Sequence, residues 1–344
     1  MKKILIVGAG GFIGFNLSKF FLKKKYKIIG IDNLSREGSA NKINFLKSNF
    51  RNFNFYKCDI TDYKKLKNII SKLNNLKSII HTAGQVTVTE SINDPIQDFK
   101  INSMGTLYLL ELIKKYHRSS KFIFSSTNKV YGNLNELKIL KRKNNYLLRN
   151  YHNGVSESLN VDFCSPYGCS KGSADQYVKD FGRIFNMNTV VLRKSCIYGH
   201  EQLGIFGQGW ISFIMIQAIM GNKITIFGDG YQTRDILYID DLVELYNKII
   251  NKNYKGYEFY NVGGGKQNLL SVKDLILFLK KRNLIKKKIV YAPERLGDQK
   301  TYYSNISKVS KQYNWKPKVF KDSGLQKILD YFLNNIDLLE KIYK

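Results

Sequence analysis

The feature that most constrains this fold is a short apolar run that ends in a cluster of glycines. Residues 4–7 (ILIV) lead directly into Gly8-Ala9-Gly10-Gly11-Phe12-Ile13-Gly14. A short, unbroken apolar run is typical of a strand buried in a parallel sheet. From Phe12 to about Lys24 the pattern is that of an amphipathic helix. The sequence therefore predicts a strand, a glycine-rich turn and a helix in immediate succession.

Strand and helix patterns go on alternating through the first half of the chain. Further strands are predicted at residues 27–31, 54–56, 78–81, 121–125 and 189–192. Helical patterns lie between them at residues 63–73, 96–116 and 171–185. This alternation predicts an α/β fold with a doubly wound parallel sheet of the Rossmann type, covered by helices on both faces.

After about Leu192 the alternation gives way to a mixed pattern. Helices are predicted at residues 210–220 and 272–281 and after Asp322, and strands at 224–227, 236–239 and 288–291. We expect a nucleotide-binding domain at residues 1–192, to which 231–261 return. Residues 193–230 and 262–344 should form a smaller, mixed α/β C-terminal substrate domain. The polar stretch 133–163 is expected to be an irregular flap.

Composition narrows the functional classes. The formal net charge is +29, but the lysines are spread from Lys2 to Lys344 and no nucleic-acid recognition pattern accompanies them. We expect no nucleic-acid partner, and a positive field that helps to attract an anionic substrate. The four cysteines are scattered and the four histidines lack metal-ligand spacing. No apolar run is long enough to cross a membrane. These features predict a cytoplasmic protein without a metal site.

The glycine turn predicts a dinucleotide site. Glycines allow close backbone approach, and the helix N-terminus offers amides and partial positive charge to a pyrophosphate. Asp32, at the end of the second strand, can accept hydrogen bonds from a ribose and would repel a 2′-phosphate, so NAD is favoured over NADP. Arg36 nearby could weaken that preference. The alternative is that the glycines serve packing only. The predicted cofactor-binding residues are Gly8, Gly11, Phe12, Ile13, Gly14, Asp32, Asn33, Ser35, Arg36, Asp59, Ile60, Ala83, Gly84, Gln85, Asn102, Ser125, Tyr167 and Lys171.

Three side chains carry the predicted chemistry. Tyr167 and Lys171 are four residues apart and therefore share one face of a helix, with Ser165-Pro166 suited to its start. A phenol has a pKa of about 10. We expect the Lys171 ammonium and a positive nicotinamide to lower that pKa. Thr127, at the end of an apolar strand, can hydrogen-bond the same substrate oxygen. The alternative for the Tyr–Lys pair is an ordinary surface contact.

This set resembles the extended short-chain dehydrogenases/reductases, the group of nucleotide-sugar epimerases and dehydratases. The resemblance covers almost the whole chain and includes SSTNKVYG at 125–132, DFCSPYGCSKG at 162–172 and QGW at 208–210. It implies a Rossmann domain, a Thr127–Tyr167–Lys171 triad and an NAD-dependent epimerase of a nucleotide-diphosphate sugar. It further implies inversion at C2 of a CDP-linked 3,6-dideoxyhexose for polysaccharide biosynthesis, and a homodimer or homotetramer.

Other activities stay open at this point. Asn128-Lys129 stands where dehydratases of this group resemble one another in carrying an Asp-Glu pair, so dehydration is disfavoured. The alternatives are C4 epimerisation of a UDP-hexose, another nucleotide-sugar oxidoreductase, and a non-catalytic nucleotide- or RNA-binding protein.

Two arginines are predicted to bind the diphosphate of the substrate. Arg234 and Arg295 match positions that hold the diphosphate in related enzymes, and planar guanidinium groups suit phosphate oxygens. Either could instead be a surface ion-pair partner, and Trp210 could be a core residue. The predicted substrate-binding residues are Gln85, Thr127, Asn128, Gln208, Trp210, Arg234 and Arg295.

Overall fold

A computed structural model describes residues 2–343, and the chain divides into two compact units. The first unit extends to Val130 and adds residues 163–193 and 243–260. The second unit comprises residues 131–162 and 194–242 and the chain from Asn261 onward. Both units are therefore assembled from separate stretches of the sequence.

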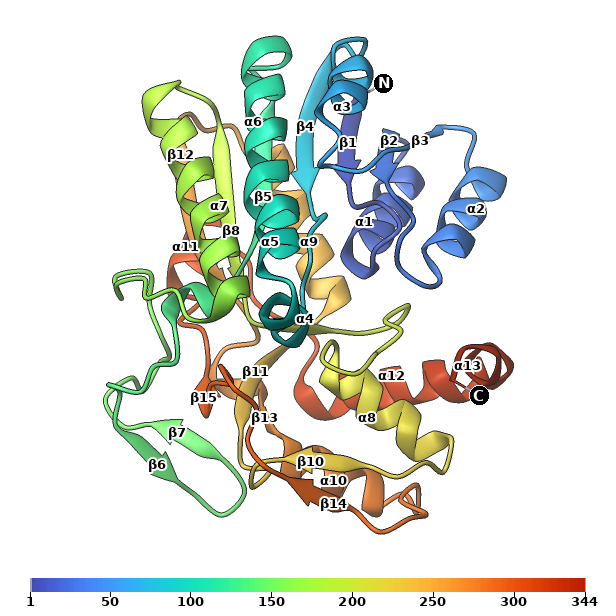
Figure 1. Ribbon diagram of the computed structural model, residues 1–344, viewed down its shortest axis with the longest axis vertical. Coiled ribbons are helices and arrows are strands. Elements are labelled where there is room, and N and C mark those ends of the chain that lie inside the picture. The colour runs from blue at the N-terminus through green and yellow to red at the C-terminus, as the bar shows by residue number, and fades with distance from the viewer. Residues whose placement is uncertain (1, 344) are drawn as a thin grey trace. The chain divides into compact units, whose positions relative to one another are not determined.

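A seven-stranded sheet forms the centre of the first unit, in the order β3-β2-β1-β4-β5-β8-β12 (Figure 1). The pairs from β3 to β5 are all parallel. This order, with its reversal between β1 and β4, confirms the predicted doubly wound fold. The strands are β1 (Lys3–Val7), β2 (Lys27–Asp32), β3 (Phe53–Lys57), β4 (Leu76–His81), β5 (Lys121–Thr127), β8 (Thr189–Lys194) and β12 (Tyr257–Val262).

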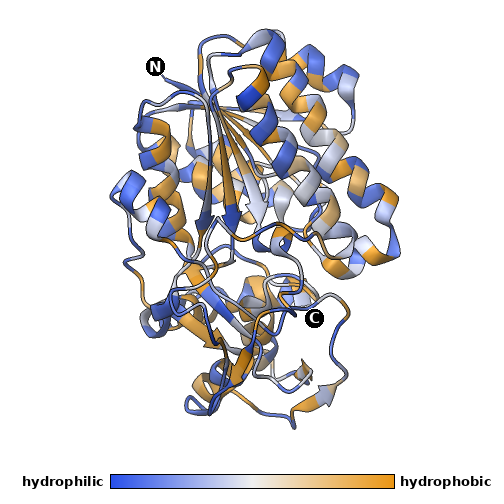
Figure 2. Ribbon diagram, turned by 90° about the vertical axis from the view of Figure 1, so that its left-hand side faces the viewer, coloured by the Kyte–Doolittle hydropathy of each residue, from blue (hydrophilic) through white to orange (hydrophobic). Residues whose placement is uncertain are grey.

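Helices cover both faces of this sheet and turn their apolar residues toward it (Figure 2). Helix α6 contacts both α3 and α7, and α1 packs on β1 and β2 with α2 beside it. Burial of this apolar surface is what stabilises the layers. The helices are α1 (Phe12–Lys23), α2 (Ser39–Asn49), α3 (Tyr63–Ile70), α4 (Val88–Asn93), α5 (Pro95–Phe99), α6 (Gly105–Tyr116), α7 (Ser165–Ile184) and α9 (Ile239–Asn251).

The helices of this unit depart from prediction in three places. The predicted helix 96–116 is interrupted by a π-helical turn at Lys100–Met104. Helix α7 begins at Ser165, as the Ser165-Pro166 pair indicates and earlier than the helical pattern at 171–185, and the Ser165 hydroxyl accepts a hydrogen bond from the Gly168 amide at 3.2 Å. Helices α2 and α4 were not predicted, because both are short and largely polar.

Strand β11 is the centre of the second unit. It pairs in parallel with β9 and β15 and antiparallel with β13, while β10 pairs with β14. This mixed α/β arrangement agrees with the fold predicted for the C-terminal part. The strands are β6 (Ile139–Lys141), β7 (Tyr146–Leu148), β9 (Cys196–Tyr198), β10 (Thr225–Phe227), β11 (Thr233–Tyr238), β13 (Leu269–Ser271), β14 (Val290–Ala292) and β15 (Thr301–Tyr302). The helices are α8 (Trp210–Ile219), α10 (Val272–Lys280), α11 (Ser307–Tyr313), α12 (Lys321–Leu333) and α13 (Ile336–Tyr343).

The prediction that residues 133–163 are irregular was partly wrong, because β6 and β7 form an antiparallel hairpin within them. Tertiary contacts hold this hairpin in place. The Tyr146 amide donates to the Tyr231 carbonyl at 3.1 Å, and the Thr301 hydroxyl donates to the Tyr146 carbonyl at 3.0 Å. Both partners are remote in sequence, so the local pattern gave little sign of the hairpin.

Within residues 2–343, no helix combines the length and the apolar character that a bilayer crossing needs. In the same residues, no group of three or more His, Cys, Asp or Glu side chains is placed to hold a metal ion.

A buried ion pair joins α7 to β8 in the first unit. Arg193 donates to both carboxylate oxygens of Asp175, at 2.8 and 3.0 Å, and both side chains are almost fully buried. The Ser126 hydroxyl donates to the same carboxylate at 2.7 Å. The pair therefore holds the helix that carries Tyr167 against strands β5 and β8.

We predict that Arg193→Met lowers the free energy of unfolding by about 3–5 kcal/mol, because it leaves the Asp175 charge buried and unpaired. Asp175→Leu combined with Arg193→Met should recover most of this loss, because no isolated charge then remains. Urea unfolding of the single and double variants measures both effects. A single variant as stable as the wild-type protein would contradict the prediction.

Candidate active site

The glycine turn brings the start of α1 close to the end of β1. Gly8 has φ +91°, and a Cβ there would lie 2.5 Å from the Ala83 backbone nitrogen. A Cβ on Gly14 would lie only 2.0 Å from the Gly8 carbonyl oxygen. Both positions therefore require glycine, one for backbone conformation and contact, the other for contact alone.

The N-terminus of α1 fits the pyrophosphate of a dinucleotide. Its N-cap is Gly11, no side chain caps it, and its first turn holds no acidic residue. The first amides of a helix have no partner within the helix, so those of Phe12, Ile13 and Gly14 can donate to phosphate oxygens. Side chains larger than glycine in this turn would fill the space that the phosphates need.

Asp32 is held by the backbone at the end of β2. Its Oδ2 accepts from the Gly10 amide at 2.9 Å and its Oδ1 from the Leu34 amide at 2.8 Å. These bonds fix a carboxylate beside the glycine turn, where it can accept from ribose hydroxyls. The structure thus places Asp32 next to the predicted pyrophosphate site.

A second polar group lies beside Asp32. Asn33 donates to Asp59 Oδ2 at 2.7 Å and also accepts from the Ser35 hydroxyl at 2.8 Å. Asp59 Oδ1 accepts from the Thr61 hydroxyl, and these hydrogen bonds outweigh burial and lower the pKa of Asp59. The Ile60 side chain is buried and packs close to Gly105. The structure thus brings Asn33, Ser35 and Asp59 together.

Arg36 reaches toward both the cofactor residues and the catalytic residues of the first unit. Burial lowers the pKa of its guanidinium, while the carboxylates of Glu90 and Asp32 and the phenol of Tyr167 favour its charged form. Its positive charge therefore lies near Asp32 and can partly offset the repulsion of a 2′-phosphate.

The segment after β4 lies next to the glycine turn. The Ala83 amide donates to the Val7 carbonyl at 2.9 Å. A Cβ on Gly84 would lie 2.8 Å from Asn102 Oδ1 and 3.7 Å from Lys171 Nζ. Gln85 donates to the Thr87 carbonyl at 2.8 Å and to Glu90 at 3.0 Å. Gly84 thus separates the cofactor side of the sheet from Asn102 and Lys171.

The three predicted catalytic residues meet at the end of β5. The Thr127 hydroxyl lies close enough to the Tyr167 phenol to favour its ionised form, and Thr127 Oγ1 accepts from the Lys129 amide at 3.2 Å. Lys171 lies one helical turn beyond Tyr167, with Nζ 4.2 Å from the centre of the Phe124 ring. A hydroxyl and a phenol that lie next to one another can both hydrogen-bond the same oxygen of a substrate.

The predicted decrease in the pKa of Tyr167 needs more than Lys171, because burial acts in the opposite direction. Burial raises the pKa of Tyr167 to about 12; the Thr127 hydroxyl and Arg36 favour the phenolate, and Asp98 opposes it. Burial also lowers the pKa of Lys171 to about 8, although Asp175 and Asp98 favour the ammonium. Lys171 alone thus does not supply the shift, because burial disfavours the phenolate more strongly.

Three other predicted residues have defined surroundings. The Ser125 hydroxyl is 2.8 Å from the Tyr246 hydroxyl of α9, in a buried position. This hydrogen bond joins β5 to α9 and gives Ser125 a structural role. Asn128 is buried directly after Thr127. Asn102 donates to Asp98 and Ser170, so it joins its own helical segment to α7.

Sequence reasoning missed two groups around Asn102. Asp98 and Ser170 are both almost fully buried, and Ser170 precedes Lys171 directly. The four-residue spacing of Asp98 and Asn102 in a helical segment was the available signal, since such residues share a face.

In the second unit, the structure brings the two predicted arginines together around Asp298. Arg234 donates to Asp298 Oδ1 at 2.8 Å, and Asp298 also acts electrostatically on Arg295. Trp210 and Arg234 lie close enough to Cys196 to favour its thiolate, although burial raises the pKa of that thiol. Gln208, just before α8, pairs through its backbone with Ile205.

Arg295 packs against two aromatic rings that were not predicted and that contact each other edge-to-face. Its guanidinium carbon is 4.0 Å from the centre of the Phe227 ring and 4.7 Å from that of Phe206. Among the described residues, its buried Nε has no hydrogen-bond partner. These two ring contacts restrict the guanidinium group, and a planar guanidinium can make a bidentate contact with an anion.

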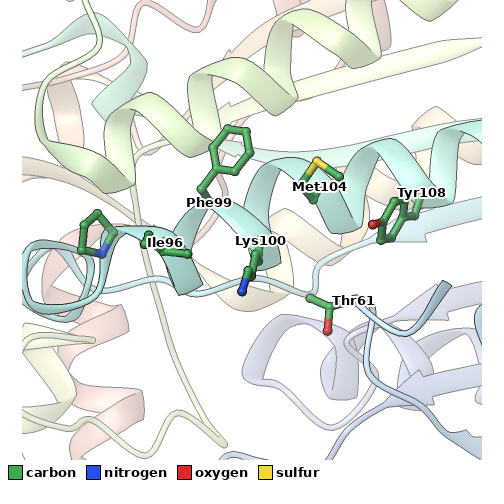
Figure 3. Close-up of a pocket in the computed structure, with 7 residues that line it drawn as sticks. Thr61, Ile96, Phe99, Lys100, Met104 and Tyr108 are labelled. Atoms are coloured by element: carbon green, nitrogen blue, oxygen red, sulfur yellow. The ribbon is translucent and has the colours of Figure 1, made fainter.

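A cavity of about 670 Å³ lies elsewhere in the first unit (Figure 3). Figure 3 shows its side chains following one another along the helical segment from α5 into α6, with Thr61 facing them. It is lined by Thr61, Pro95, Ile96, Phe99, Lys100, Met104 and Tyr108. None of the predicted catalytic residues lines it.

Comparisons with known proteins agree with this geometry. The chain is 39% identical to CDP-paratose 2-epimerase of Salmonella typhi, over 96% of this chain and 98% of that protein. It is 31% identical to UDP-glucose 4-epimerase of Thermotoga maritima, solved with UDP-glucose, with a TM-score of 0.82 over 97% and 99% of the two chains.

Another solved relative, UDP-glucuronic acid 4-epimerase of Bacillus cereus, was determined in complex with UDP-glucuronic acid and NAD. It is 29% identical, with a TM-score of 0.78 over 99% of this chain and 100% of the other. Residues 5–328 match the family described as GDP-mannose 4,6 dehydratase. The chain therefore belongs to that family, within the extended short-chain dehydrogenases/reductases.

Proposed function

We propose that this protein is an NAD-dependent epimerase of a nucleotide-diphosphate sugar. The observation that carries the proposal is that the Thr127 hydroxyl and the Tyr167 phenol lie next to one another at the end of β5, with Lys171 one helical turn away. The glycine turn and Asp32 lie in the same unit and fit a dinucleotide. The Bacillus cereus relative, an epimerase solved with NAD and a nucleotide sugar, supports both cofactor and reaction.

The residues can remove and return one proton at a sugar hydroxyl. NAD, when bound, supplies the acceptor and donor of hydride. The Tyr167 phenolate takes the proton from the sugar hydroxyl as the carbon–oxygen bond becomes a carbonyl, and Thr127 donates a hydrogen bond to that oxygen. Lys171 in its ammonium form favours the phenolate through charge. When the ketone presents its other face, Tyr167 returns the proton and the configuration is inverted.

The absence of an acidic pair directly after Thr127 favours epimerisation over loss of water. Asn128 and Lys129 follow it directly, and neither is an acid. Elimination of water from a sugar needs a group that protonates the leaving hydroxyl, in addition to the proton acceptor. Asn128 and Lys129 therefore support epimerisation, a reaction in which the sugar loses no hydroxyl group.

The proposed substrate is a CDP-linked 3,6-dideoxyhexose, with inversion at C2 that converts CDP-paratose to CDP-tyvelose. Its support is the 39% identity to the Salmonella typhi enzyme over almost the whole chain. Arg234 and Arg295 would hold the diphosphate, since both guanidinium groups lie around Asp298 and Arg295 is restricted by two rings. C4 epimerisation of a UDP-hexose is the alternative, the activity named for the Thermotoga maritima enzyme, whose 31% identity is lower than that of the Salmonella typhi enzyme.

Two finer points are predictions that rest on the sequence. A homodimer or homotetramer is implied by the family resemblance alone. A cytoplasmic location is inferred from the scattered cysteines.

We predict that the purified protein interconverts CDP-paratose and CDP-tyvelose without added NAD, because a cofactor that oxidises and then reduces the same sugar must stay bound. The measurement is NMR of the sugar products after incubation with CDP-paratose and, separately, with UDP-glucose. Conversion of UDP-glucose alone would favour C4 epimerisation. Conversion of neither, by protein that holds NAD, would contradict the proposed substrates.

Tyr167→Phe should reduce kcat by about 10²–10⁴, because it removes the group that transfers the proton. NAD should stay bound, since the glycine turn and Asp32 are unchanged. The matched control is Tyr177→Phe, which removes an exposed phenol from the same helix and should leave kcat unchanged. Near-normal turnover by the Tyr167 variant would exclude the assigned role.

Arg295→Lys should raise KM by about tenfold with little change in kcat, because lysine keeps the charge but loses the planar, stacked guanidinium. Arg282→Lys is the matched control. Arg282 also stacks on an aromatic ring, that of Phe278, and is exposed where it bonds Gln326. An unchanged KM in the Arg295 variant would show that Arg295 does not hold the substrate.

A further inference from the structure

A buried carboxylate that the proposed mechanism does not use lies beside the catalytic helix. Asp98, in helix α5, is 1% exposed. Its Oδ2 accepts from the Ser170 hydroxyl, and its Oδ1 accepts from Asn102 Nδ2 at 3.1 Å. Burial of an acid is costly unless its oxygens are hydrogen-bonded. Both oxygens of Asp98 are bonded, and both partners adjoin the catalytic residues.

The hydrogen bonds of Asp98 lead directly to the turn of α7 that carries the reaction. Ser170 lies between Tyr167 and Lys171, and its hydroxyl is 3.2 Å from the Tyr167 carbonyl oxygen. Asn102 Nδ2 also donates to Ser170 Oγ at 3.1 Å, and the Ser103 hydroxyl donates to the Ser170 carbonyl at 2.8 Å. The α5 carboxylate and the π-helical turn thus hold the same residue of α7.

The π-helical turn gives Asn102 a second contact with the active site. A π turn inserts one extra residue in a helix and re-aims the side chains around it. Asn102 Oδ1 is buried without a hydrogen-bond partner among the described residues. It faces Gly84, next to Lys171 Nζ. Asp98 orients this amide, because it binds the Nδ2 group and leaves Oδ1 toward Lys171.

The charge of Asp98 also influences the two catalytic residues of α7. Asp98 favours the ammonium of Lys171 and opposes ionisation of Tyr167, while Lys171 in turn stabilises the Asp98 carboxylate against its burial. The other charged or titratable groups acting on this pair are Asp175 on α7, which favours the ammonium, and Arg36, which favours the phenolate.

Two more groups complete these surroundings. The buried His81 ring at the end of β4 is close enough to Lys171 for the ammonium to lower its pKa further, beyond the decrease that burial causes. Helix α4 contributes Glu90, which bonds Gln85 and interacts with Arg36.

We propose that Asp98 is a positioning residue of the reaction, which holds the Tyr167–Lys171 turn through Ser170 and Asn102 and sets its local charge. This inference rests on the proposed function, because it assigns how the same triad is held. Asp98 does not touch the substrate and transfers no proton. Its carboxylate keeps one turn of α7 in place and keeps negative charge beside Lys171.

The test compares Asp98→Asn with Ser170→Ala in the full chain, by the pH dependence of kcat/KM for the sugar that the wild-type protein converts. Asp98→Asn should lower kcat by about tenfold or more, because the hydrogen bonds that place the turn are altered. In the plot of kcat/KM against pH, the rising limb and the falling limb of the Asp98→Asn variant should both move to lower pH by about half a unit or more. The reason is that the lost negative charge had favoured the protonated forms of Tyr167 and Lys171.

Ser170→Ala should also lower kcat, but with the limbs unmoved, because it breaks the link and leaves the Asp98 charge. The control Asp180→Asn removes an exposed acid from α7, where it pairs with Arg183, and should change neither quantity. Thermal unfolding and retained NAD show whether each variant is folded.

The outcomes separate the two proposals. Active wild-type protein with a folded, NAD-retaining Asp98→Asn variant whose limbs have not moved would overturn the role of Asp98 and leave the proposed function intact. An unfolded Asp98→Asn variant, with Ser170→Ala fully active, would reduce Asp98 to a structural residue. A wild-type protein that converts no nucleotide sugar would overturn both.

Discussion

The close contact between Gly14 and the Gly8 carbonyl determines how the first unit can bind and react. It lets α1 start directly behind β1, so that the first amides of the helix face the end of the sheet. The reversal of strand order between β1 and β4 opens the sheet at this point. Asp32, Gly84 and Thr127 then reach the same edge, because parallel strands end on one side. A larger residue at position 14 would move α1 and with it the whole arrangement.

Burial is the strongest electrostatic influence on the catalytic pair. It raises the pKa of Tyr167 and lowers that of Lys171, so burial pushes each group toward its neutral form. Thr127, Arg36 and the nearby acids only adjust this balance. A positively charged ring bound next to Tyr167 would act in a site from which water is largely removed, where charge interactions are strong. The phenolate is therefore best favoured when the dinucleotide is in place.

Buried polar groups hold α7 from two directions. Asp175 is bonded to Arg193 and Ser126, and Asp98 to Ser170 and Asn102. Such bonds are directional, unlike apolar packing, so they define the rotation of the helix as well as its position. In the second unit, Phe206 and Phe227 restrict a charged group at Arg295.

The sequence by itself determined the Rossmann topology, the glycine turn, Asp32 and the Thr127–Tyr167–Lys171 set. These follow from local signals, namely apolar period, glycine spacing and residues one helical turn apart. Only the tertiary structure decided the β6–β7 hairpin, the π-helical turn, the bonding of Ser125 to Tyr246, and the raised pKa of Tyr167. Each of these depends on partners far apart in the chain or on removal from water. Such contacts arise when separate segments pack together, so no local pattern of residues reports them.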